Sequence, residues 1–152
     1  MLVKRNRMLA AVLVCLGGLL LAACGPSATP TPGTDETAVE VELGEWFVRP
    51  SVDAVPTGGV RFDAANVGQL EHELVILRTD LAADALPMRA QDTSRVDEAA
   101  SGELIGEIEP DELGPGEEAS ATLALEAGSY VLLCNLPGHY VNGMRTPLRV
   151  DP

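Results

Sequence analysis

One short stretch near the C-terminus, residues 134–144, constrains this chain more than any other. It places a thiol, an imidazole and a thioether at five-residue steps, in Cys134, His139 and Met144. Pro137 and Gly138 bend the stretch, so we interpret it as a turn-rich loop. Side chains spaced in this way meet at one point only if a rigid scaffold holds both ends of the loop.

The chain has two histidines, and the second lies far from this loop. His72 precedes the apolar residues 74–77, which places it at the start of a predicted buried strand. Two imidazoles, one thiolate and one weak thioether are the ligand set of a mononuclear blue-copper site, which suits both Cu(I) and Cu(II). We therefore predict that His72, Cys134, His139 and Met144 bind one copper ion, with Met144 as the weak axial ligand.

Each of these residues also has a simpler interpretation. A free cysteine such as Cys134 is often a buried core thiol. Met144 fits a gap-filling core residue, and His139 fits a histidine on a surface loop. Zinc accepts the same donors, so a structural zinc site is the alternative for the metal. The coincidence of all the donors at these spacings favours the copper site.

The start of the chain is typical of an export signal. A basic segment, residues 4–7, precedes an apolar run, residues 8–21, which is short for a transmembrane span. The run ends in Leu-Ala-Ala-Cys at positions 21–24, which resembles a bacterial lipobox. The resemblance implies that residues 1–23 are a lipoprotein signal peptide and that lipid on Cys24 anchors the chain to a membrane. An ordinary small-residue cleavage site is the alternative.

This assignment accounts for the three cysteines. Cys15 lies in the apolar run and is removed, and Cys24 carries the lipid. Cys134 is then the single free thiol of a chain in an oxidising compartment, where thiols usually pair. Metal ligation is a good reason for a lone cysteine in that setting.

The rest of the chain divides into a tether and one domain. Residues 24–36 are rich in Pro, Thr, Ser and Gly, so we interpret them as the lipidated Cys24 and an extended tether. Residues 37–152 have the size of a single domain. After the signal, 23 acidic residues outnumber seven basic ones, for a net charge of −16. This charge excludes nucleic acid as a partner, and it either keeps the protein soluble or favours basic partners.

Short alternating segments dominate the domain and predict β-structure. In residues 37–43, the valines and Leu43 share one face, and Glu40 and Glu42 share the other. Further strands are predicted at residues 46–49, 60–64, 74–77, 104–108, 119–125, 129–133 and 146–150, with a turn at residues 55–59. Seven or eight short strands indicate an all-β, antiparallel sandwich or barrel.

One long excursion, residues 80–102, interrupts this pattern. We expect a short helix at residues 81–86, and a loop of this length is typically functional or mobile. Trp46 and Phe62 are expected in the core.

The spacing Asn66-x-Gly68-x3-His72, followed by Cys134-x4-His139-x4-Met144, resembles the cupredoxin family of plastocyanin, azurin, auracyanin and rusticyanin. It is most similar to auracyanin and rusticyanin, which have the longer ligand loop. The resemblance implies a Greek-key β-sandwich with these four residues as copper ligands. It also implies that His139 is the ligand nearest the surface and the electron port.

Two features around the ligands are left open by the resemblance. Several relatives have a small or amide residue directly after the first histidine, where it braces the cysteine loop, and this chain has Glu73. Leu136, Pro137, Tyr140 and Val141 flank His139, and they either form an exposed apolar patch or pack the ligand loop.

These observations predict a one-electron carrier on the extracytoplasmic side of a membrane, periplasmic or at the cell surface. A monomer is expected, and its partners are redox proteins such as cytochromes or a membrane oxidase. The alternative is a copper chaperone or copper-delivery protein. An enzyme is not expected, because multicopper oxidases need many more histidines and Met144 fills the position that a mononuclear reductase leaves open.

Overall fold

The computed structural model describes residues 36–152. The predicted signal peptide (1–23), Cys24 and the tether up to residue 35 lie outside the described residues. Within the described part, no helix has the length and apolar character needed to cross a bilayer.

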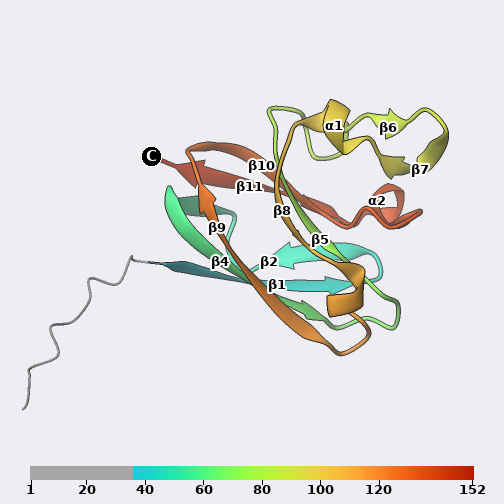
Figure 1. Cartoon of the computed structure of the whole chain (residues 1–152), viewed down its shortest axis with the longest axis horizontal. Helices are drawn as coiled ribbons and strands as arrows, with labels where there is room; N and C mark the ends of the chain where they lie inside the picture. The colour runs from blue at the N-terminus through green and yellow to red at the C-terminus, as the bar shows by residue number, and fades with distance from the viewer. Residues whose placement is uncertain (1–35) are drawn as a thin grey trace, which may run out of the picture. The chain divides into compact units, whose positions relative to one another are not determined.

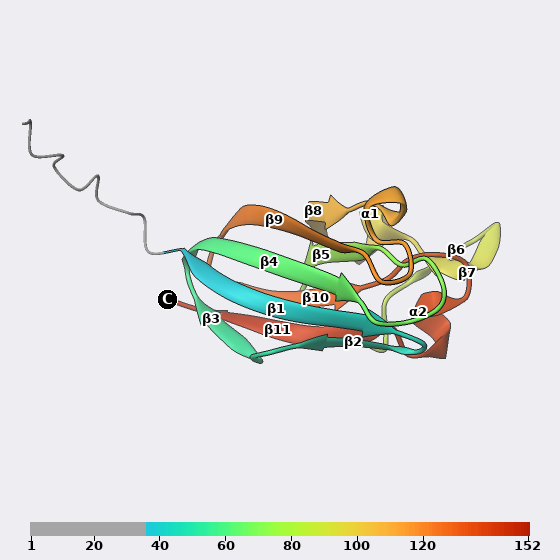
Figure 2. The same ribbon diagram turned by 90° about the horizontal axis from the view of Figure 1, so that it is seen from below.

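Two β-sheets face each other and form a sandwich (Figures 1 and 2). The four-stranded sheet has the order β2-β1-β4-β9, and the five-stranded sheet has the order β3-β11-β10-β5-β8. The strands of the first sheet are β1 (Thr37–Gly44), β2 (Phe47–Pro50), β4 (Gly58–Asn66) and β9 (Glu118–Leu125). Those of the second are β3 (Ala54–Pro56), β5 (Leu74–Arg78), β8 (Glu103–Ile108), β10 (Gly128–Leu133) and β11 (Arg145–Asp151).

The remaining elements are short. They are the hairpin β6 (Met88–Arg89) and β7 (Asp92–Val96), the helices α1 (Glu98–Ser101) and α2 (His139–Asn142), and the 3₁₀ turn η1 (Pro110–Glu112).

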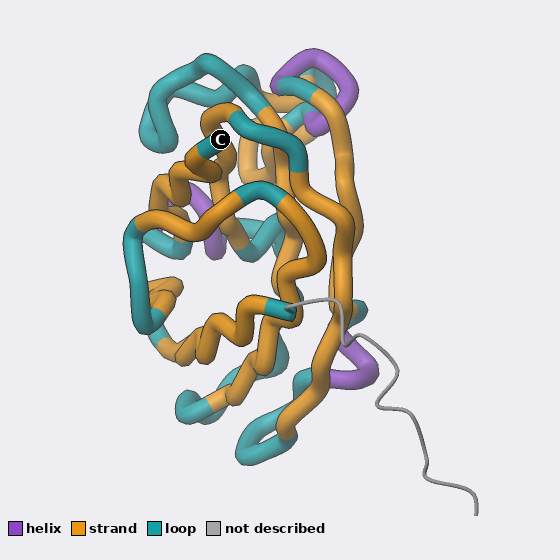
Figure 3. Tube along the Cα trace, turned by 90° about the vertical axis from the view of Figure 1, so that its left-hand side faces the viewer, coloured by secondary structure: helices purple, strands orange, loops and turns teal. Residues whose placement is uncertain are grey.

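The main core fills the space between the two sheets, which Figure 3 shows from the end of the molecule. Alternation in β1 buries Val39, Val41 and Leu43 and leaves Glu40 and Glu42 exposed, as predicted. A strand with one buried face needs this period of two, because successive side chains point to opposite sides of the sheet.

A second core lies on the outer face of the five-stranded sheet. Leu74 and Ile76 of β5 point into the main core, whereas Val75 and Leu77 belong to a separate cluster with Leu86. The other members of this cluster are Val96, Val131, Leu133 and Tyr140. Burial on both faces explains why β5 is a continuous apolar run rather than an alternating strand.

The excursion at residues 80–102 supplies this outer cover. It contains the hairpin β6–β7 and the helix α1, and β7 lies beside α2 (Figures 1 and 2). The helix expected at residues 81–86 is wrong. That stretch forms bends and a turn instead, in which the Ala85 N–H donates to Ala82 O (2.9 Å), and Pro87 disfavours a helical conformation at Leu86.

The predicted all-β sandwich is confirmed, and two details differ. Two strand pairs, β1 with β4 and β3 with β11, are parallel, so the sheets are mixed. Val55 and Pro56, which the sequence placed in a turn at residues 55–59, belong to the edge strand β3. Prolines are tolerated on an edge strand, because its outer N–H groups need no partner.

Phe62 tests the main core directly. Its side chain is fully buried in β4, so we expect Phe62→Ala to lower the free energy of unfolding by about 3–5 kcal/mol. Leu104→Ala is the matched control, because that side chain is 44% exposed and its loss should cost about 0.5 kcal/mol or less. Denaturant unfolding measures both, and equal losses would contradict the assignment of the core.

Candidate metal centre

Three of the four predicted ligands meet at one end of the sandwich. His72 Nδ1 lies 3.2 Å from His139 Nδ1, and Cys134 Sγ lies 3.3 Å from the same nitrogen. The donor atoms of all three residues lie within 4.8 Å of one another. His72 and Cys134 are 0% exposed, and His139 is 8% exposed.

The strand pairing brings these residues together. His72 comes just before β5, and Cys134 comes directly after β10. The two strands are antiparallel neighbours, with Val75 opposite Leu133, so the start of β5 and the end of β10 lie at the same end of the sheet.

The ligand loop returns to its starting point, and it places Met144 beside Cys134. The Cys134 N–H donates to Met144 O (3.1 Å), and the Met144 N–H donates to His139 O (3.1 Å). Gly138 and Gly143 turn the loop with φ angles of 87° and 123°, which favour glycine. Met144 is fully buried and packs in the same core cluster as Cys134.

The spacing of the three donors fits a metal ion. Metal–nitrogen distances of ~2.0–2.1 Å in a trigonal plane separate neighbouring ligand atoms by ~3.5 Å. The contacts of 3.2 and 3.3 Å at His139 Nδ1 are close to that value. Two imidazoles and one thiol are also the donors that suit copper, and they accept zinc. His72, Cys134 and His139 therefore form a cluster that can hold a copper ion.

Burial sets the protonation of the cluster. It lowers the pKa of His139 and of His72, and the neighbouring imidazole lowers that of His72 further. Both imidazoles are thus neutral at pH 7 and have a lone pair for a metal. Burial raises the pKa of Cys134 to about 11, so the thiol keeps its proton until a cation replaces it.

Glu73, the residue directly after His72, contacts the cysteine loop. Its carboxylate Oε1 accepts the N–H of Asn135 (2.7 Å), and its own N–H points at Cys134 Sγ at 3.5 Å. Burial raises the pKa of Glu73, and the Asn135 N–H opposes that rise. Glu73 thus links the start of β5 to the residue after Cys134 and braces the cysteine loop.

The excursion holds the ligand loop from outside. The Asn135 side chain accepts the N–H of Val96 (2.6 Å) and donates to Val96 O (3.1 Å) and to Glu98 Oε1 (2.5 Å). The Tyr140 hydroxyl donates to Ala83 O (2.8 Å) and accepts the N–H of Leu86 (3.1 Å). These contacts could not be predicted from the sequence, because no motif or spacing in residues 80–102 indicates that they lie against the ligand loop.

Of the apolar residues that flank His139, some pack the ligand loop and others are exposed. Tyr140 is buried and packs the loop, and Leu136 is partly buried against the main core. Pro137 and Val141 are exposed.

The core position expected for Trp46 is wrong, whereas Phe62 is buried as expected. Trp46 is 42% exposed, and its ring meets the His139 ring edge to face, with 5.2 Å between centroids and 81° between planes. It lies in the tight turn between β1 and β2, where no strand partner draws its side chain into the sandwich.

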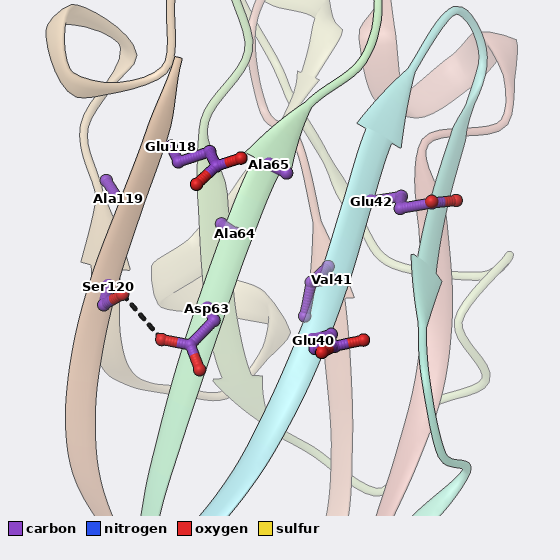
Figure 4. Close-up of a pocket in the computed structure, with 9 residues that line it drawn as sticks. All are labelled: Glu40, Val41, Glu42, Asp63, Ala64, Ala65, Glu118, Ala119 and Ser120. Atoms are coloured by element: carbon purple, nitrogen blue, oxygen red, sulfur yellow. Dashed lines mark hydrogen bonds between the residues drawn. The ribbon is translucent and has the colours of Figure 1, made fainter. Parts of the chain in front are cut away.

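A surface hollow on the four-stranded sheet is separate from the donor cluster (Figure 4). Its acidic lining residues are Glu40, Glu42, Asp63 and Glu118. Asp63 accepts a hydrogen bond from Ser120 Oγ (2.7 Å), so this carboxylate is already paired. None of the donor residues lines the hollow, and its carboxylates contribute to the negative charge of the surface.

No family model matches the chain. A reduced auracyanin from Roseiflexus castenholzii superimposes with a TM-score of 0.55 at 25% identity, covering 76% of this chain and 98% of that one. Auracyanin B gives 0.51 at 21% identity, covering 80% and 93%. Rusticyanin from Thiobacillus ferrooxidans gives 0.51 at 17% identity, covering 76% and 77%. The chain therefore has the cupredoxin fold.

One curated protein is similar in sequence. It is the copper-resistant cuproprotein CopI of Rubrivivax gelatinosus, which is 35% identical over 94 residues. The match covers 56% of this chain, and the chain spans about half (47%) of the length of that protein.

The protonation of Cys134 predicts a proton count. Between pH 7 and 9 both imidazoles are neutral and the thiol is protonated, so each bound Zn²⁺ should release one proton from Cys134. Affinity should rise about tenfold per pH unit in this range, because a falling proton concentration favours the thiolate.

Calorimetry in two buffers of different ionisation enthalpy measures the released proton, and Cys134→Ser is the control that should release none. If the wild-type protein released no proton at pH 8, Cys134 would not be a ligand that binds by losing its proton.

Proposed function

We propose that the domain binds one copper ion through His72, Cys134, His139 and Met144 and acts as a one-electron carrier. The observation that carries this proposal is the convergence of two buried imidazoles and one buried thiol within 4.8 Å. Met144 is proposed as the weak axial ligand, because its backbone pairs with that of Cys134 and its side chain is fully buried.

Bound copper would supply one-electron chemistry by alternating between Cu(I) and Cu(II). The chain's own residues hold the donors in place and exclude water. The Glu73 N–H approaches the Cys134 sulfur, and the Asn135 side chain fixes the loop just after it. A site held in this way keeps its geometry when the charge of the metal changes.

His139 is the proposed port for electrons. It is the one member of the cluster with a measurable exposed fraction, 8%, and its ring contacts that of Trp46. Trp46 and Val141 are 42% and 51% exposed, so apolar surface surrounds the port. Surface of this kind favours brief docking of redox partner proteins, for which cytochromes or a membrane oxidase are our candidates.

The location follows from the N-terminal sequence. We infer that residues 1–23 direct export, that lipid on Cys24 anchors the chain on the extracytoplasmic side of a membrane, and that residues 25–36 are the tether. The acidic surface favours partners with a basic face and keeps a monomer soluble. An enzymatic role is not proposed, because Met144 as a ligand would occupy the position that a substrate would need at the metal.

A second candidate is copper handling, either as a chaperone or in delivery. The similarity to a protein named for copper resistance supports it. A delivery site must release its metal readily, whereas these donors are 0–8% exposed and the loop is hydrogen-bonded to the excursion. Transfer of Cu(I) to a competing chelator within seconds would favour delivery over electron transfer.

A spectroscopic titration tests the proposed function. We expect an intense blue absorption band that saturates at one Cu(II) per chain, with a narrow copper hyperfine splitting in the EPR spectrum. Cys134→Ser should abolish the blue band, because the thiolate carries the charge transfer. A blue Cys134→Ser variant would exclude Cys134 as the ligand, and a colourless wild-type protein would overturn the proposal.

Substitution of Met144 tests the axial ligand. Met144→Leu should keep the blue band and raise the reduction potential, because the axial ligand tunes the potential of such sites. Met88→Leu is the matched control, since Met88 packs against the second core and should leave the potential unchanged. Equal potentials in the wild-type and Met144→Leu proteins, measured by voltammetry, would remove Met144 from the site.

A further inference from the structure

The turn between β1 and β2 places a carboxylate beside His72. Glu45 Oε1 lies 3.4 Å from His72 Nε2, on the side of the ring opposite to the donor cluster. This nitrogen is buried, and it has no well-aligned hydrogen-bond partner among the described residues. Glu45 is therefore the polar group best placed to accept a hydrogen bond from an N–H at the outer nitrogen of His72.

The loop after β4 fixes the position of this carboxylate. Glu45 Oε1 accepts the N–H groups of Gln69 (2.9 Å) and Leu70 (2.8 Å). Two backbone N–H donors at one oxygen stabilise the carboxylate form of Glu45. Asn66 in turn holds the loop, because its side chain donates to Leu70 O (2.7 Å).

Gly68 leaves the room that the carboxylate occupies. A Cβ atom at position 68 would lie 2.6 Å from Glu45 Oε1 and 2.8 Å from Oε2. Any larger residue would push the carboxylate away from His72. The Gly68 N–H also donates to Asn66 Oδ1 (2.9 Å), so the glycine and the asparagine act together to shape the carboxylate site.

The carboxylate decides which nitrogen of His72 carries the proton. With the proton on Nδ1, the lone pair of Nε2 would face the negative Glu45, and a buried acceptor facing another acceptor is unfavourable. With the proton on Nε2, the ring donates toward Glu45. The Nδ1 lone pair then faces His139 Nδ1 at 3.2 Å, inside the donor cluster. A metal-binding histidine commonly shows this arrangement, with its outer N–H directed at a carboxylate.

We propose that Glu45 is a positioning residue of the metal centre, which holds His72 with its Nδ1 lone pair toward the metal and lowers the reduction potential of bound copper. This inference rests on the proposed function. The negative charge of Glu45 stabilises Cu(II) more than Cu(I), because Cu(II) carries the larger positive charge. Glu45 is not one of the donor residues, and it acts through His72.

The experiment separates this role from a purely structural one. Glu45→Gln keeps an oxygen that can accept the N–H groups of Gln69 and Leu70, and it removes the charge. We expect the purified variant to remain blue and its reduction potential to rise by ~59 mV, a tenfold change in the preference for Cu(I) over Cu(II). A structural role alone predicts no change in the potential.

Glu71→Gln is the matched control, because it makes the same change of charge at an exposed residue adjacent to His72 in the chain. It should shift the potential much less than Glu45→Gln. If both variants are blue and shift the potential equally, the inference is overturned, while the proposed function stands. A colourless wild-type protein would instead overturn the proposed function.

A measurement without any variant tests the tautomer. Two-bond ¹H–¹⁵N spectra of the metal-free wild-type protein distinguish the two nitrogens of His72. We expect the Nε2–H form, and the Nδ1–H form would overturn the inference even if Glu45→Gln failed to fold.

Discussion

The antiparallel pairing of β5 with β10, and of β10 with β11, is the constraint on which the metal centre depends. The first pairing sets Val75 opposite Leu133, and the second sets Leu133 opposite Arg145. Cys134 comes directly after β10, Met144 directly before β11, and His72 just before β5. All three therefore lie at the same end of the sheet. A slip of one residue in either register would turn the donors to opposite faces, because side chains alternate along a strand.

The excursion at residues 80–102 is a structural part of this centre. It covers the outer face of β5 and β10 with a second apolar cluster, and it holds the ligand loop through Asn135 and Tyr140. The loop is thus fixed on one side by the sandwich and on the other by the excursion. This arrangement explains how a turn-rich loop can keep Cys134 and His139 in place, since short loops alone have few contacts to hold them.

The sequence was sufficient to predict the parts of the structure that repeat or that carry unusual chemistry. Alternation predicted β1, and the rarity of histidine in the chain pointed to His72. The missing parts depend on contacts between distant segments. Glu45 and Trp46 lie in a turn of ordinary composition, and their importance follows only from the loops at residues 66–72 and 134–144 that lie beside them. The parallel pairing of β1 with β4 is likewise decided by the whole sandwich.

The proposed transfer of electrons makes opposite demands on burial and access, and this structure meets them in different places. His72, Cys134 and Met144 are completely enclosed, which protects the thiol and keeps water from the donors. The enclosure is thinnest at His139, where a partly exposed indole lies against the imidazole edge. An electron needs only a contact of this kind, whereas a departing metal ion needs the loop to open against the hydrogen bonds of Asn135 and Tyr140. The residues that enclose the donors therefore favour exchange of electrons over exchange of metal.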